Sequence, residues 1–224
     1  ADAKPGEYTS LLDWGLRLAF MLALPAAVAL WVLALPLVST LYQYGRFTVN
    51  DVLQTRTALL GYSVGLLGLI VVKILAPGFY ARQMLRTPVK IAVATVLVSQ
   101  TLALILMFPL GHAGLTLSTS IGACLNAGLL FWFLRKRGIY SPRAGWALFV
   151  AKLVVALFVL AVVLLWLEGP ASYWLAASLW EKVFRLTGVC AAGATAYFGA
   201  LWLLGFRLTD FDRRDIAAED QAKP

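Results

Sequence analysis

Eight polar side chains lie at the ends of long apolar segments or inside them, where they could bind an anionic headgroup or a pyrophosphate. Guanidinium and ammonium groups bind phosphate oxygens through charge-assisted hydrogen bonds. Polar and ionisable groups at membrane depth are costly and often mark a substrate path. The eight candidates for substrate contact are seven cations and one amide: Arg46, Arg56, Lys73, Arg82, Arg86, Lys90, Gln100 and Lys152.

Simpler explanations compete with this hypothesis. Lys73 lies within a turn of the end of its apolar segment, and Lys152 lies about 12 Å into its own by helical rise. Both stems are long enough to bring the ammonium back to the interface. Arg82 and Arg86 stand four residues apart beside aromatic residues, which predicts an amphipathic interfacial elbow over residues 77–87. Ordinary anchoring of a basic cytoplasmic loop explains that elbow equally well.

The sequence lacks the residue patterns that common enzyme active sites need. His112 is the only histidine, no pair of carboxylates lies within the apolar segments, and the chain has no CxxC, HExxH or phosphate-binding glycine loop. Cys124 and Cys190 lie within apolar runs, which favours buried small hydrophobes over a disulfide. We expect no catalytic residue, no metal and no cofactor.

Composition indicates which elements must position the candidates. Hydrophobic residues make up 61% of the 224 residues and charged residues 13%, and the mean hydropathy is +0.82. Soluble domains are near half apolar and a quarter charged. Runs long enough to cross a hydrocarbon core of about 30 Å, without strict alternation, predict helices. The fold class is therefore an all-α integral membrane bundle with about six transmembrane helices, over about 11–42, 52–76, 88–108, 113–134, 144–167 and 181–205.

The positive charge follows membrane topology. The net charge is +8, but most Lys and Arg lie between the apolar runs, so we expect no nucleic-acid partner. Three loops or tails that share a side are the most basic, which predicts both ends of the chain in the cytoplasm. Aromatic residues gather around the loop that follows the fifth segment and predict an outer interfacial belt: Trp166, Tyr173, Trp174 and Trp180.

Within the segments, polar and small residues allow two interpretations. Ser99, Gln100 and Thr101 lie at the centre of the third segment, and Thr116 and Ser120 share a face of the fourth. They could line a hydrophilic lumen, or they could bond between helices and to their own backbone.

Two prolines and one ion pair mark the first segment. Pro25 and Pro36 predict either a bend or an end near Leu35. Asp13 and Arg17, four residues apart, predict an intrahelical ion pair. The chain begins at Ala1 with a polar stretch unlike a signal peptide, so we expect a fragment that lacks its upstream part.

Several loops and helix ends resemble the MurJ (MviN) family of the MOP, MATE-like exporter superfamily. The resemblance covers nearly the whole chain, and its most specific part is APGFYARQ followed by TPVKIA. The sequences that carry it are LDWGLR (12–17), QYGRFT (43–48), YSVGL (62–66), KILAPGFYARQ (73–83), RTPVKIA (86–92), HAGLTLS (112–118), CLNAGLL (124–130) and LRKRGIY (134–140).

The family fold is MATE-like and has fourteen spans. The resemblance implies that this chain holds part of that fold, namely its last six spans. Residues 1–142 would hold helices nine to twelve of the C-terminal lobe, 143–206 an accessory pair that forms a lipid-tail groove, and 207–224 a cytoplasmic tail. It implies a lipid II flippase of the bacterial inner membrane that moves the undecaprenyl-pyrophosphate-linked peptidoglycan precursor outward by alternating access. The implied partners are lipid II, membrane lipids and the missing N-terminal helices. Relatives that bind sodium use an acid on helices that carry none here, which again predicts no metal.

Other readings remain. A polysaccharide-unit flippase or drug exporter of the same superfamily would share the fold, although the GFYAR–TPVK stretch argues against it. A non-transporting membrane scaffold would need no polar site at all.

Overall fold

A computed structural model describes residues 5–80, 83–140, 142 and 145–206, with side chains from residue 9 onward. It is helical throughout most of these ranges. The helices are α1 (Pro5–Val32), α2 (Ala34–Tyr42), α3 (Val49–Tyr80), α4 (Arg86–Leu110), α5 (His112–Lys136), α6 (Trp146–Glu168), α7 (Ala171–Ala176) and α8 (Leu179–Leu203). Within the described ranges, six of them are long and apolar enough to cross a membrane, so the predicted fold class is confirmed.

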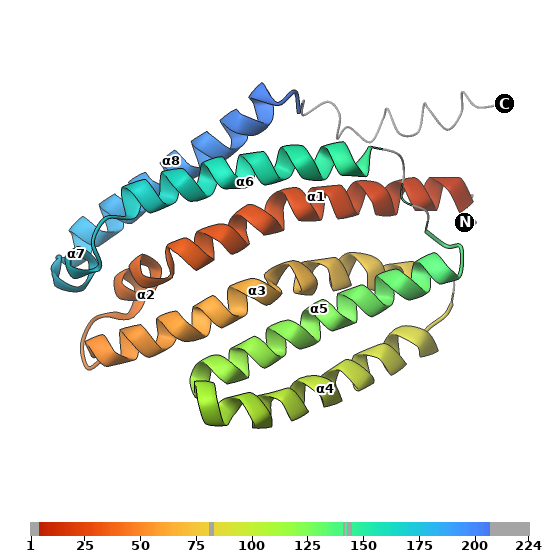
Figure 1. The fold of residues 1–224 in the computed structure, drawn as a ribbon, viewed down its shortest axis with the longest axis horizontal. Helices are drawn as coiled ribbons and strands as arrows, with labels where there is room; N and C mark the ends of the chain where they lie inside the picture. The colour runs from red at the N-terminus through yellow and green to blue at the C-terminus, as the bar shows by residue number, and fades with distance from the viewer. Residues whose placement is uncertain (1–4, 81–82, 141, 143–144, 207–224) are drawn as a thin grey trace.

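The long helices run side by side between two ends of the molecule (Figure 1). One end, which we call the basic end, holds the start of α1, the α3–α4 and α5–α6 connections and the close of α8. The opposite end, which we call the α7 end, holds α2, α7 and the start of α3. A side chain is called exposed where no other residue of this chain covers it.

The first segment is two helices, which decides between the two outcomes expected for it. α1 passes through Pro25 without interruption and stops at Val32, and α2 starts after Leu33. Pro36 lies in the first turn of α2, where its missing N–H and fixed φ are well tolerated. The break therefore lies one turn before the second proline.

Helices α3 and α5 pack closely because glycines line their contact. A Cβ added at Gly65 would lie 2.4 Å from Ser120 Cα, and one at Gly68 would lie 2.7 Å from Cys124 N. The Ser120 hydroxyl donates to Gly61 O at 2.7 Å, which ties the two helices directly. Close backbone approach of this kind is what holds helices together in lipid.

Glycine also makes the sharp turn between α4 and α5. Gly111 has φ +55°, a left-handed conformation that L side chains rarely adopt. Its N–H donates to Met107 O and closes α4, and α5 begins at the next residue. α4 therefore lies along α5 at the outer edge of the bundle (Figure 1).

Helices α6 and α8 form a second layer on α1. Buried side chains of α1, α6 and α8 make one core cluster, with Leu153, Leu160 and Leu164 from α6 and Val189 from α8 among its members. A capping box at Ser178 and Glu181 starts α8. The division into four lobe helices and an accessory pair stays a prediction.

The interfacial elbow expected over residues 77–87 is wrong in part. Pro77 to Tyr80 form the last turn of α3, and α4 already starts at Arg86. Phe79 is fully buried in the core between α1, α3 and α5, and this packing keeps the turn helical beyond the proline. Gln83 to Leu85 are the described residues that remain outside a helix.

Candidate functional site

An apolar pocket of about 550 Å³ opens near the basic end between α1, α3, α5 and α6. Its wall is made of aliphatic and aromatic side chains and of backbone at two glycines. The lining residues that matter below are Phe20, Gly68, Gly128, Phe131, Tyr140 and Trp146. Because its walls are overwhelmingly apolar, the pocket suits a hydrocarbon chain and not a headgroup.

A buried carboxylate holds two of the pocket's aromatic walls in place. Asp13 is 3% exposed, and its Oδ1 accepts a hydrogen bond from Tyr140 Oη and another from Trp146 Nε1, each at 2.7 Å. The Arg17 Nε lies 2.9 Å from Asp13 Oδ2, and its guanidinium stands over the Trp146 and Phe149 rings. The predicted intrahelical pair is confirmed, and the same carboxylate also ties α1 to the α5–α6 connection.

The Tyr140 phenol stays a hydrogen-bond donor in this cluster. The pKa of Tyr140 is raised above its ordinary value, mainly by burial and secondly by the hydrogen bond to the Asp13 carboxylate. The proton therefore remains on the phenol throughout the physiological range, and the pocket wall is fixed over that range.

The predicted substrate contacts do not form one site. Arg86 and Lys90 are exposed one turn apart at the start of α4, and Lys73 is exposed on α3 toward the same basic end. Arg46 and Arg56 are exposed at the α7 end. Arg82 lies outside the described residues.

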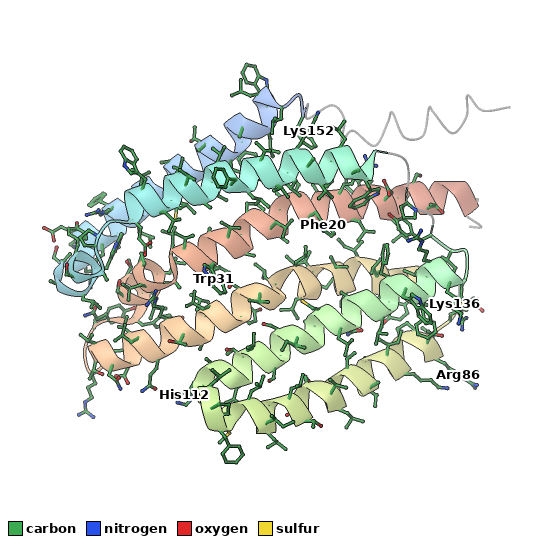
Figure 2. The ribbon with its side chains drawn as sticks, in the orientation of Figure 1. Phe20, Trp31, Arg86, His112, Lys136 and Lys152 are labelled. Carbon is green, nitrogen blue, oxygen red and sulfur yellow. The ribbon has the colours of Figure 1, made fainter. Side chains whose placement is uncertain are left out.

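The two remaining candidates stand apart from these groups. Gln100 is exposed at the middle of α4. The Lys152 Nζ stands 5.4 Å from the centroid of the Phe206 ring, beyond the close of α8. Figure 2 shows Arg86 and Lys136 together at the basic end, with Lys152 on α6 well away from them.

Most of the hydroxyls expected at mid-depth donate hydrogen bonds to backbone carbonyls of their own helices. Ser99 and Thr101 donate to Val96 O and Leu97 O, and Thr116 donates to Ala113 O. Ser120 is the exception, because it bonds across to α3. These bonds favour the packing interpretation over a lumen formed by α4 and α5.

A buried lysine at the α7 end was not among the predicted sites. Lys182 is 4% exposed, and its Nζ donates to Gln43 Oε1 at 2.9 Å. The Gln43 Nε2 donates in turn to Leu175 O at 3.0 Å. The sequence around Lys182 gives no sign of burial, and only the packing of α2 against α8 reveals that its side chain is covered.

The expected aromatic belt is wrong for one of its four members. Trp174 is fully buried, and its Nε1 donates to Glu168 O at 2.8 Å. α7 folds this ring inward against α2 and α3. Trp166 and Trp180 are exposed as expected.

Comparison with known proteins identifies the family. Residues 1–185 match the family described as lipid II flippase MurJ. The lipid II flippase MurJ of Burkholderia cenocepacia is 46% identical over 214 residues, which cover 95% of this chain and 42% of that protein. The probable lipid II flippase MurJ of Vibrio cholerae is 37% identical over 93% of the chain and 40% of its own length. The chain belongs to the MurJ family.

Two further findings qualify that membership. This MurJ-family chain spans about two fifths of the length of the curated relatives it matches. Among solved structures, lipid II flippase MurJ in an inward closed conformation matches with a TM-score of 0.67 at 19% identity, over 87% of this chain and 40% of that one. At that identity the likeness shows the fold, which is that of part of the MurJ structure.

Proposed function

We propose that this chain is the C-terminal part of a flippase that moves lipid II from the inner to the outer leaflet of the bacterial cytoplasmic membrane by alternating access. Family membership over most of the chain carries the proposal, because the matched relatives are named as lipid II flippases. The partners would be lipid II, the surrounding lipids and the remaining helices of the same protein.

The basic end and the pocket offer complementary chemistry for such a substrate. Exposed cations at the basic end, Arg86 and Lys90 among them, suit a pyrophosphate. The apolar pocket lies near that end and suits part of a prenyl chain. The exposed cations at the α7 end, Arg46 and Arg56, would meet the headgroup only in an outward-open state.

The proposed orientation places the basic end in the cytoplasm. Among the described residues, cations at that end far outnumber acids, with Arg135, Lys136 and Arg137 adjacent at the close of α5. At the α7 end, Asp51, Glu168 and Glu181 nearly balance the four cations. By the positive-inside rule, this imbalance supports the proposal that both ends of the chain lie in the cytoplasm.

A complementation experiment tests the function. The full-length gene is expressed in a bacterium depleted of its own MurJ, and lipid II is assayed with an externally added enzyme that cleaves only outer-leaflet lipid II. We expect growth and cleavable lipid II to return together. Growth with no cleavable lipid II would reject the proposed substrate.

The pocket has a separate test in the same assay. At Gly128 an added Cβ meets nothing within 4 Å, so Gly128→Leu fills the pocket without disturbing the helix contacts. We expect transport to fall about tenfold, which is the loss of a contact worth about 1.4 kcal/mol. Gly188→Leu on α8, where a Cβ also meets nothing within 4 Å, is the matched control. Equal activity of the two variants would show that the pocket takes no chain.

A further inference from the structure

Pro25 leaves a gap in the hydrogen bonding of α1. In an α-helix the N–H of residue i donates to the carbonyl of residue i−4. Proline has no N–H, and Pro25 lies inside α1. The Met21 carbonyl therefore receives no i→i−4 hydrogen bond, within a segment apolar enough to lie in the membrane.

A side chain from α8 fills this gap. The Tyr197 hydroxyl donates to Met21 O at 2.7 Å across 176 residues of sequence. Tyr197 is 1% exposed and belongs to the cluster that joins α1, α6 and α8. Lipid offers no hydrogen-bond donor to a free carbonyl, so the phenol satisfies a group that the helix itself cannot.

This bond also specifies where α8 sits. The cluster that surrounds it, between α8 and α1, is built from apolar side chains, and apolar side chains gain little from leaving lipid for one another. A directional bond at the proline gap constrains the register of α8 against α1 in a way that the aliphatic contacts beside it do not.

We propose that Tyr197 is a positioning residue whose hydroxyl supplies the hydrogen bond that Pro25 removes from α1 and so fixes the α6–α8 pair at that point of the lobe. Its meaning for lipid transport rests on the proposed function. The docking of α8 on α1 through Tyr197 does not depend on the substrate. The docking role and the transport function are therefore tested by separate measurements.

A double-mutant cycle in the full-length protein tests the docking. The variants are Tyr197→Phe, Pro25→Ala and the combination of both. Tyr173→Phe is the control, because Tyr173 contacts the Arg185 guanidinium through the face of its ring. Tyr197→Phe leaves a buried carbonyl without a donor, whereas the N–H restored by Pro25→Ala already satisfies that carbonyl. We expect the Tm in detergent to fall by about 1–2 °C for Tyr197→Phe, and by much less when Pro25→Ala is already present.

A distance measurement gives a second readout that is independent of transport. Spin labels are attached through Leu22→Cys and Phe198→Cys, both at exposed positions, in a protein whose other cysteines are removed. We expect a narrow distance distribution that broadens with Tyr197→Phe and narrows again when Pro25→Ala is added. A ring that acts only by packing would show no such rescue.

The outcomes separate the two proposals. Unchanged Tm and distances in Tyr197→Phe, or equal losses with and without Pro25→Ala, would overturn the docking role. If the cycle shows the expected coupling while lipid II is not moved, the docking stands and the proposed substrate fails.

Discussion

The Asp13 carboxylate fastens three parts of the chain at the basic end through contacts with Tyr140, Trp146 and Arg17. Sequence spacing indicated only the pair with Arg17, because positions four apart on a helix are neighbours by geometry. Tyr140 lies 127 residues away, and no local pattern reports such a contact. Buried charges are kept by several good hydrogen bonds, so Asp13 should be intolerant of change.

Tyr140→Phe should destabilise the full-length protein by about 1.5–3 kcal/mol, the usual worth of a hydrogen bond to a charged group. The pKa of Tyr140 is raised in the folded chain, so the contribution is complete below the unfolded pKa of about 10 and is lost as pH rises above it. Thermal unfolding at several pH values measures this. A difference between the two proteins that stayed constant above pH of about 10 would contradict the assigned cause.

Among the elements, α3 and α5 share the most extensive contact, and glycines allow the two helices to approach closely. Gly61 and Gly65 form a GxxxG pair in the second apolar segment, but such pairs are common in apolar helices and do not identify the partner helix. The structure supplies the partner, because Gly65 faces Ser120 and Gly68 faces Cys124. Helix positions could thus be predicted from length and hydropathy, while helix pairing depends on local fits that single segments do not show.

Gly65→Ala should cost about 1–3 kcal/mol of stability, because its Cβ would collide with backbone that cannot move aside. Gly188→Ala is the matched control, since its Cβ meets nothing within 4 Å, and it should gain up to about 1 kcal/mol from helix propensity. Thermal unfolding of the two full-length variants in detergent compares them. Similar stability would mean that α3 and α5 are further apart than described.

At the scale of the whole molecule, the six membrane helices and their order followed from the sequence because hydrocarbon thickness dictates segment length. The boundaries differ from those predicted by a few residues at most ends. The extra helix α7 and the burial of Trp174 did not follow, because a six-residue helix has too little periodicity to register as an element. The predicted cations that the structure describes lie toward both ends of the molecule, so these side chains do not meet in a single anion-binding site.

The proposed orientation can be tested by thiol labelling of intact cells. His112→Cys, at the start of α5, should react with a membrane-impermeant reagent added outside. Lys136→Cys, at the close of α5, should react only after the membrane is opened. Both positions are exposed, so access to the compartment decides the result. The reverse pattern would invert the topology.

The covered ammonium of Lys182 bears on how the protein is assembled. α8 is synthesised after α2, and chains insert from the N-terminus onward. In the proposed orientation the α6–α8 hairpin must carry Lys182 across the hydrocarbon to the far face, where the Gln43 amide that receives it is already in place. In this order of assembly the charge of Lys182 reaches an acceptor that is already in place, so we expect a Gln43 substitution to leave more α6–α8 hairpins incompletely inserted.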